Sequence, residues 1–593
     1  MTILYLVSVI ILWIEMVVCR KSEQKQNLMI WGILSVAMVL CVQVLCGGII
    51  GKLGIPVSCG SVGIFNLVIS LFLALWIVKK GRQTYEIKIL DVVSILLILG
   101  IIMLFSLSKY GRHLDVIDYI SPDASSHAAS AMTVALEHRI PTNLYFTSLN
   151  TGLMMQAYQA LTGAGRFDLY RVFIWCEIVY TALAALLFWA LIRQRCGENR
   201  WQRFVPLLLA PFYWAGYPLY STLFGFSYLG IAVCLFEVLL LLLDLYFRGR
   251  IRTILFVAGM NLALYGIFVS YTLFVPAAFF GVFAALALKM SREKSRKLVS
   301  VENILIMLKV FLVPTVLGLL YSFSNVEALA PGTGGIRNEG ACYNDIYSNF
   351  ILLIPFMILG IYFLVSRKEG GYLLPLAAVQ AVLMAVMMTG LMTGKVSVYY
   401  YTKMNSVCWL LAWALVAESI LGMARHCKWA ILFPFFFYGV VFMGKYWDTW
   451  QEKANPLAGR VEVWNFCDLI MINNTYFNFD TYMTPETMEL YRYAADHYAP
   501  GEAAGVHLER ECGWFRTLTG QENTYTYAGK EEFLEEVEEK GIRYICAGYG
   551  KPYETYKEFL DLQEVVMENG AGKILKVVVK PSEMRSGEIP GSP

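Results

Sequence analysis

TILFVAGMNLALYGIFVSYTLFVPAAFFGVFAALAL, residues 253–288, is an uncharged apolar run of 36 residues between two basic segments, RGRIR and KMSREKSRK. One helix of this length would measure about 54 Å, whereas the hydrocarbon core of a bilayer is about 30 Å thick. Basic connectors stay on the cytoplasmic side of a membrane, so both ends of the run belong on that side. The chain must therefore cross the membrane and return, with a turn near FVSYT, residues 268–272.

Apolar runs of membrane-spanning length recur from the N-terminus to about residue 445. The chain is 58% hydrophobic and 16% charged, whereas about a quarter of the residues are charged in soluble domains. Short basic connectors alternate with connectors that hold few cations, which predicts about fourteen crossings with both termini outside. The expected spans are 3–19, 28–46, 61–78, 89–108, 170–192, 204–222, 225–247, 253–268, 270–288, 303–323, 349–365, 373–392, 404–422 and 429–444. We therefore expect an all-α, multi-pass protein of the cell membrane, in contact with the lipid bilayer along its length.

The same alternation places the long connectors on the outer side. These are the loops at about 109–169, 324–348 and 393–403, together with a C-terminal region that starts near residue 446. KEEFLEEVEEKGIRYICAGY predicts a helix, a glycine stop at Gly541 and a strand, and LQEVVMENGAGKILKVVV predicts a hairpin around residues 569–572. The expected organisation is a transmembrane domain, 1–445, followed by a small extracytoplasmic α/β domain, 446–593.

No segment carries a nucleotide motif or a metal motif. GGIIGKLG lacks the spacing and the Ser or Thr of a phosphate-binding loop, and the thirteen cysteines have no ligand-like spacing. We expect no cofactor and no nucleic-acid partner. A divalent metal is left open, because Asp115, Asp118 and Asp123 could gather one. Since nucleotide sugars are cytoplasmic, an enzyme acting on the outer side would need a lipid-linked donor.

SPDASSHAASAMTVALEHRIP, residues 121–141, holds the most titratable groups of the first outer loop. Ser121 suits an N-cap and Pro122 the first helical position, so a helix should run through DASSHAASAMTVALEH with a mildly apolar face along the membrane surface. Asp123 and His127, four residues apart, would then project from the same side.

A partly desolvated carboxylate at a membrane interface can accept a proton from a sugar hydroxyl. Asp123 is therefore a candidate general base, with Asp115 and Asp118 as alternatives. The helix dipole alone also favours an aspartate in a first turn, so a purely structural role explains the same residue. His127 fits a positioning or structural role better than that of the base.

GKVSVYYYTKMN, residues 394–405, places Lys403 in the first turn of a membrane helix whose N-terminus faces outward. A cation opposes the dipole there, and a bound phosphate held by Lys403, the helix N-terminus and the hydroxyls of residues 399–401 would explain it. Anchoring at the membrane interface by Tyr and Lys explains the pattern equally well. The glycine-rich loop 330–345 adds Arg337 and Glu339 on the same side.

These features together resemble the GT-C superfamily, polytopic glycosyltransferases that use polyprenyl-phosphate-linked sugars, in particular its mannosyl- and arabinosyltransferases. The likeness lies in the first outer loop SPDASSHAASAMTVALEHRIP, the late outer YYYTK and the C-terminal outer domain. It departs in the three helices that precede the one feeding this loop, and in Ala124 where the family has a second acidic residue. The resemblance implies Asp123 as general base and, more weakly, a role for His127. It also points to Lys403 and, more weakly, Arg337 as the cations that hold the lipid phosphate. To substrate binding we further assign Tyr400, Tyr401, Glu339 and Asp118.

The implied reaction is inverting transfer of a sugar from a polyprenyl phosphate to a glycan or another cell-envelope acceptor. Asp123 takes the acceptor proton and the cations stabilise the leaving lipid phosphate. A lipid-linked-oligosaccharide flippase is the first alternative, because fourteen helices suit a transporter. Few charges lie near span interiors, Glu177 and Lys309 among them, and Glu237 is expected near a span end. An envelope polysaccharide polymerase or ligase is the second alternative, but it usually has an outer loop rich in Arg and His.

Overall fold

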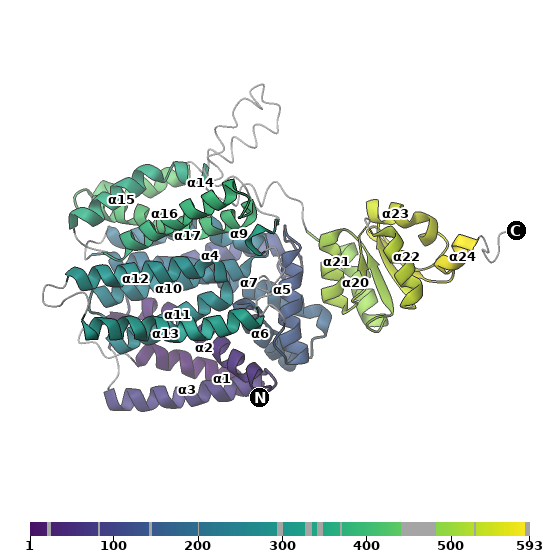
Figure 1. The fold of residues 1–593 in the computed structure, drawn as a ribbon, viewed down its shortest axis with the longest axis horizontal. Helices are drawn as coiled ribbons and strands as arrows, with labels where there is room; N and C mark the ends of the chain where they lie inside the picture. The colour runs from purple at the N-terminus through teal and green to yellow at the C-terminus, as the bar shows by residue number, and fades with distance from the viewer. Residues whose placement is uncertain are drawn as a thin grey trace, which may run out of the picture. The chain divides into compact units, whose positions relative to one another are not determined.

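The computed structural model of the chain is predominantly helical (Figure 1). The structure describes residues 1–19, 25–80, 84–141, 145–197, 199, 201–292, 300–325, 335–340, 348–367, 371–439, 482–526 and 529–586. The chain divides into two compact units. Unit 1 comprises Met1–Leu104, His138–Asn150 and Glu177–Phe479, and unit 2 comprises Phe105–Glu137, Thr151–Cys176 and Asp480–Pro593.

Unit 1 holds the apolar helices. Their bounds are α1 Thr2–Val18, α2 Leu28–Lys52, α3 Cys59–Lys80, α4 Ile89–Tyr110, α7 Tyr170–Arg195, α8 Val205–Trp214, α9 Tyr217–Leu223, α10 Ser227–Phe247, α11 Thr253–Ser270, α12 Val275–Arg292, α13 Val301–Asn325, α14 Ser348–Ile351, α15 Ile354–Arg367, α16 Leu373–Met392 and α17 Val398–Ala424. The ends of α4 and the start of α7 belong to unit 2. A short parallel pair, β1 Gln26–Asn27 and β2 Tyr85–Glu86, joins two connectors.

Ten helices among the described residues are long and apolar enough to cross a membrane, and α1 and α15 are shorter apolar helices. The prediction of a polytopic helical membrane protein is therefore confirmed, whereas the count of fourteen crossings is not. The expected span 204–222 is split into α8 and α9 at residues 215–216, because Gly216 has a non-helical ψ of −126° and Pro218 lacks the amide hydrogen that a continuous helix would need. Of the expected span 429–444, the described part begins with the short 3-10 helix Lys428–Leu432.

The expected turn within residues 253–288 is confirmed. Helix α11 ends at Ser270, Tyr271 takes an extended conformation with φ of −157°, and a 3-10 turn, Thr272–Phe274, leads into α12. In Figure 1, α1, α2 and α3 run side by side, as do α10, α11, α12 and α13. Helices α10 and α17 are almost wholly buried, whereas α3, α13 and α16 leave most of their apolar side chains uncovered. The first two therefore form the core and the last three have surfaces that suit lipid.

Unit 2 combines the first long loop with the C-terminal region. The loop contributes α5 Asp123–Met132, the π-helix Thr133–Glu137, most of α6 Phe146–Thr162 and the 3-10 helix Arg166–Leu169. The C-terminal elements are α20 Pro485–His497, β3 Ala503–Val506, α21 Glu509–Thr519, β4 Thr524–Tyr525, α22 Lys530–Glu539, β5 Tyr544–Gly548, α23 Lys551–Leu560, β6 Glu564–Asn569, β7 Gly572–Lys576 and α24 Pro581–Ser586. The boundary expected at 445/446 lies outside the described residues and stays a prediction.

The five strands form one mixed sheet in the order β4-β3-β5-β7-β6, with β3 parallel to β4 and β5 and with antiparallel pairs β5–β7 and β6–β7. All four residues of β3 are buried, as expected for a strand covered by helices on both faces. Figure 1 shows α20 and α21 on one face and α22 and α23 on the other. The predicted helix, strand and hairpin are confirmed, and Gly541 ends α22 with φ of +63°.

Candidate functional site

Asp123 is the first residue of α5, at the start of the helix predicted from the sequence. The cap is shifted by one residue, because Pro122 is the N-cap and not the first helical residue. The hydroxyl of Ser121, one residue before the N-cap, accepts a hydrogen bond from the Asp123 amide at 3.2 Å. The Asp123 side chain is half-buried. A carboxylate thus lies at the N-terminal end of a defined helix, where its negative charge is stabilised.

The face of α5 that was expected to lie along the membrane packs against protein instead. Ala128, Ala131 and Met132 are fully buried, and His127 is 7% exposed. The Thr517 hydroxyl of α21 donates a hydrogen bond to the Ser125 carbonyl at 3.0 Å. Because the carbonyl belongs to the first turn of α5, this bond fixes the helix segment that carries Asp123. His127, one turn further on, lies on the buried side.

Asp118 is held in an ion pair with Lys109, the last-turn cation of α4. The side chain of Lys109 is 2% exposed and that of Asp118 is 14% exposed, so the pair is largely screened from water. The backbone at Asp118 also pairs with Tyr482, and the Ile117 carbonyl accepts a bond from the Met483 amide at 2.8 Å. Asp118 is therefore engaged in holding the loop.

Residues that sequence reasoning missed connect the loop to the C-terminal region. The rings of Tyr119, Phe173 and Trp514 pack within 5.9–6.2 Å of one another. The Arg166 guanidinium donates to the Thr517 carbonyl at 3.1 Å, and Arg492 pairs with Asp168 at 2.7 Å. These contacts lie within unit 2. No local sequence signal links them, because the partners are separated by more than 300 residues.

Lys403 lies in the second turn of α17 and not in the first, because the helix begins at Val398 with Ser397 as N-cap. Its side chain is 1% exposed. The ammonium donates hydrogen bonds to the hydroxyls of Tyr228 and Tyr399.

Aromatic rings enclose the same ammonium. Its Nζ is 4.0 Å from the ring centre of Phe226, 3.7 Å from that of Tyr399 and 5.8 Å from that of Tyr271. Each ring face attracts a cation, more strongly where water is excluded. Lys403 therefore sits in an aromatic enclosure built from α10, α17 and the turn between α11 and α12. Of these partners, sequence reasoning had proposed only Tyr399.

The remaining predicted binding residues lie around the start of α17. Tyr401 packs with Val396 and with methionines of α16, and Tyr400 packs at the edge of this cluster. Arg337 and Glu339 are exposed on the segment 335–340. That segment is held at the helix start, because the Ile336 carbonyl accepts the Ser397 amide at 2.9 Å and Gly340 lies against the Tyr399 ring. The structure thus brings Arg337 and Glu339 to the same end of α17 as Lys403.

The predicted residues fall in both compact units. Unit 2 contains Asp118, Asp123 and His127, and unit 1 contains Arg337, Glu339, Tyr400, Tyr401 and Lys403. Among the described residues, which include Asp115, Asp118 and Asp123, no group of three or more Asp, Glu, His or Cys side chains is placed to hold a metal ion. Their assignment to catalysis and binding stays a prediction.

No family model matches the chain, and no curated protein matches it. Solved structures do match, among them the crystal structure of ArnT from Cupriavidus metallidurans bound to undecaprenyl phosphate. That match covers 82% of this chain and 98% of the ArnT chain, with 12% sequence identity and a TM-score of 0.46. The function proposed below rests on the residues and contacts of this chain.

Proposed function

We propose that this protein is a membrane glycosyltransferase of the GT-C kind. It transfers a sugar from a polyprenyl-phosphate-linked donor to a cell-envelope acceptor on the extracytoplasmic face of the cell membrane, with inversion. Asp123 acts as general base toward the acceptor hydroxyl, which attacks the anomeric carbon while the lipid phosphate leaves. Lys403 and Arg337 stabilise the charge on that phosphate.

The position of Asp123 at the start of α5 carries the proposal. Asp123 and Asp118 both belong to the loop that resembles the catalytic loop of the superfamily, but Asp118 is engaged by Lys109 in a screened ion pair. Asp123 is half-buried at the first position of α5, and the hydrogen bond from the Thr517 hydroxyl to the Ser125 carbonyl fixes the first turn of that helix. A general base needs a defined position, and the packing of α5 gives Asp123 one.

Lys403 contributes an enclosed positive charge beside phenol hydroxyls. A phosphate bound there would accept hydrogen bonds from the ammonium and from Tyr228 and Tyr399, which now bond to the ammonium. Because Lys403 is 1% exposed, the lipid phosphate reaches it only when the covering groups move aside. The segment 335–340, which carries Arg337, lies against the ring of Tyr399, one of the two tyrosines that bond to the Lys403 ammonium.

The test compares purified wild type with Asp123→Asn in nanodiscs, using a panel of radiolabelled polyprenyl-phosphate sugars. We expect wild type to transfer or slowly hydrolyse one donor, and Asp123→Asn to lose about 10²- to 10⁴-fold in rate while still binding that donor. Glu137→Gln is the matched control, since it removes a carboxylate from an exposed residue of the same loop that is not a candidate for the site. Full activity of Asp123→Asn, or equal loss in both variants, contradicts the assignment of the base.

A lipid-linked-saccharide transporter remains the second candidate, and one observation favours it. Glu237 lies in the middle of α10 and not near a span end as expected, and it is fully buried, as is Glu177 in α7. Ionisable groups at that depth commonly mark transport paths. Wild type would then transfer no sugar but would move a labelled lipid-linked saccharide across the liposome membrane, and Glu237→Gln would abolish this flux. That result would replace the glycosyltransferase function by a transporter function.

A further inference from the structure

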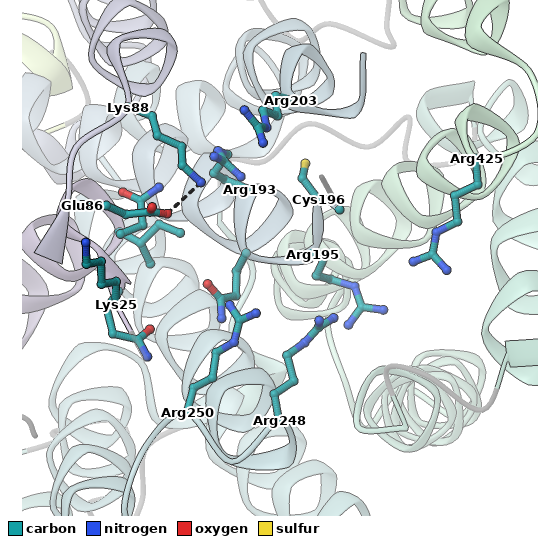
Figure 2. A pocket seen from close by; sticks show the side chains of 15 residues that line it. Lys25, Glu86, Lys88, Arg193, Arg195, Cys196, Arg203, Arg248, Arg250 and Arg425 are labelled. Atoms are coloured by element: carbon teal, nitrogen blue, oxygen red, sulfur yellow. Dashed lines mark ion pairs between the residues drawn. The ribbon is translucent and has the colours of Figure 1, made fainter. Parts of the chain in front are cut away.

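A cavity of about 350 Å³ lies at the end of unit 1 where the basic connectors meet (Figure 2). We call it the basic pocket. Its cationic lining residues are Lys25, Lys88, Arg193, Arg195, Arg203, Arg248, Arg250 and Arg425. They come from five separate connectors and helix ends, and Figure 2 shows these side chains gathered around one space. The volume is at the lower end of the range for small-ligand sites.

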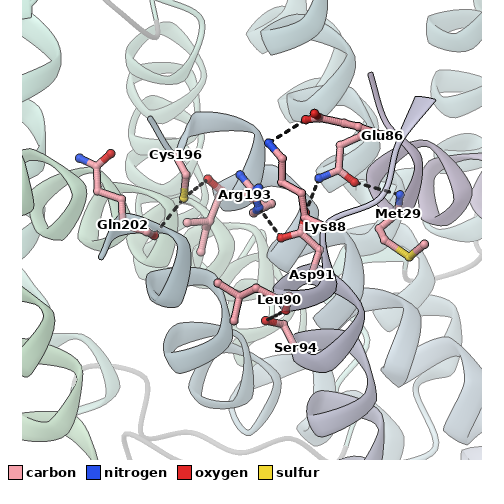
Figure 3. Close-up of polar contacts among 11 residues, drawn as sticks. Met29, Glu86, Lys88, Leu90, Asp91, Ser94, Arg193, Cys196 and Gln202 are labelled. Carbon is pink, nitrogen blue, oxygen red and sulfur yellow. Dashed lines mark hydrogen bonds and ion pairs between the residues drawn. The ribbon is translucent and has the colours of Figure 1, made fainter. Parts of the chain in front are cut away.

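Carboxylates neutralise only part of this charge. Arg193 pairs with Asp91 at 2.6 Å, and Lys88 pairs with Glu86 at 2.7 Å (Figure 3). Asp244 pairs with two arginines, Arg195 at 2.8 Å and Arg248 at 2.9 Å. Glu418 also pairs with Arg195. Four carboxylates of the described residues thus pair with four of these cations, Lys88, Arg193, Arg195 and Arg248.

Three of the lining cations, Lys25, Arg203 and Arg250, have no ion pair within the part of the chain that the structure describes. Burial first, and the nearby charge of Arg248 second, lower the pKa of Arg250. Like charges at this spacing repel one another, and an anion between them would relieve the repulsion. The unpaired positive charge of the basic pocket therefore predicts that the pocket prefers anions.

Buried donors of the same lining point to a ligand independently of the charge count. The Nη2 atom of Arg193, the Nε2 atom of Gln194 and the Nε atom of Arg203 are buried and have no hydrogen-bond partner among the described residues. Arg193 and Gln194 are each 6% exposed. Leaving a buried donor without a hydrogen bond is destabilising, so such donors normally have a partner.

The ordinary bias of membrane proteins toward cytoplasmic Lys and Arg does not account for this arrangement. That bias requires only that cations lie at one end of the helices, where they extend into water. Here Arg193 and Arg195 are buried, and the lining cations converge on a shared cavity. The pocket is also distinct from the Lys403 enclosure, because Arg425 follows the far end of α17, about 33 Å from Lys403 along the helix axis.

We propose that the basic pocket binds the phosphate groups of an anionic ligand. Guanidinium groups form paired hydrogen bonds to phosphate oxygens, and Arg203 and Arg250 supply the uncompensated charge. Two sources present this chemistry at a membrane surface: the headgroup of an anionic lipid such as cardiolipin, and a soluble polyphosphate. This inference does not depend on the proposed glycosyltransferase activity.

The test uses the full chain in phosphatidylcholine nanodiscs. In one arm, inorganic pyrophosphate is titrated by calorimetry; in the other, retained cardiolipin is counted by native mass spectrometry after incubation with cardiolipin-doped vesicles. The variant is R203Q/R250Q. The matched control is R252Q/R292Q, which removes two exposed cations, at the N-cap of α11 and at the end of α12, that do not line the pocket.

We expect wild type and R252Q/R292Q to bind at least one probe, and R203Q/R250Q to bind it at least tenfold more weakly. Binding of pyrophosphate identifies a soluble ligand, and retention of cardiolipin alone identifies a lipid. Absence of both probes from wild type, or equal weakening in both double variants, overturns the proposal. Should R203Q/R250Q fail to fold, the bound probe must still protect Arg203 of wild type from phenylglyoxal, as mapped by mass spectrometry, and unprotected Arg203 also overturns the proposal.

Discussion

Acid should loosen the C-terminal sheet through a single histidine, His507. This residue follows β3, is 1% exposed and lies between the rings of Tyr491 and Phe515, with ring-centre distances of 5.1 and 5.6 Å. Its Nε2 atom has no hydrogen-bond partner among the described residues. Burial lowers the pKa of His507 from 6.5 to about 3, because the charged imidazolium would lose its hydration there.

The sign and size of the effect follow from proton linkage. Between pH 6.5 and pH 3 the unfolded chain binds a proton at His507 and the folded chain does not, so acidification favours unfolding. The stability that the folded state gains by keeping His507 neutral is fully present above pH 6.5 and is lost as the pH falls toward 3. Each pH unit between 6.5 and 3 lowers the free energy of unfolding by about 1.4 kcal/mol. The loss is therefore about 2 kcal/mol at pH 5 and at most about 5 kcal/mol at lower pH.

Hydrogen exchange of the β3 amides in the full chain measures this loss. After correction for intrinsic rates, exchange of residues 504–506 should be about thirtyfold faster at pH 5 than at pH 7, as expected for about 2 kcal/mol. His507→Leu should remove this pH dependence. His497→Leu, which changes an exposed histidine of α20, should retain it. Equal acid sensitivity in wild type and His507→Leu would refute the reasoning, because other groups would then carry the effect.

Three other substitutions test the contacts that organise the candidate sites. Lys109→Met should cost about 3–5 kcal/mol by removing one half of a largely screened ion pair, and adding Asp118→Asn should recover much of the loss; additive losses in nanodisc thermal unfolding contradict this. Gly513→Val should destabilise unit 2 by about 1–3 kcal/mol, because a side chain at this position meets Ser125. Faster hydrogen exchange of the α5 amides measures this loss, and an unchanged exchange rate argues against the contact. Lys403→Met should weaken binding of a lipid-linked donor at least tenfold with the fold intact, and unaltered binding in a filter assay removes Lys403 from the site.

Much of the membrane fold could be predicted, because length and charge act locally. The run 253–288 had to turn, since its length exceeds a bilayer and its flanks are both basic, and the structure has the turn at 271–274. The split of 204–222 was missed although Gly216 and Pro218 signal it. Apolar composition alone does not distinguish one crossing from two short helices with the same burial. The hairpin of β6 and β7 was predictable from Asn569 and the glycines beside it.

Less of the site could be predicted, because tertiary contacts define it. The start of α5 at Asp123 follows from local capping chemistry. The pairing of Asp118 with Lys109 was within reach, since only nine residues separate them. The enclosure of Lys403 was not, because Tyr228 lies 175 residues away and an aromatic residue in an apolar run carries no sign of its partner. The basic pocket could not be predicted either, because each of its connectors is an ordinary basic segment in the sequence and only the tertiary structure brings them together.

The role of the C-terminal region follows from what α5 cannot do alone. Helix α5 has ten residues, fewer than an isolated helix needs for stability in water, and it is rich in Ala and Ser, which bury little apolar surface. Its order must come from packing, and α21 supplies that packing through Thr517 and through Gly513, whose missing side chain leaves room for Ser125. The ring stack of Tyr119 on Trp514 adds a second connection. The C-terminal sheet therefore positions the helix that carries Asp123, whether or not it also binds an acceptor.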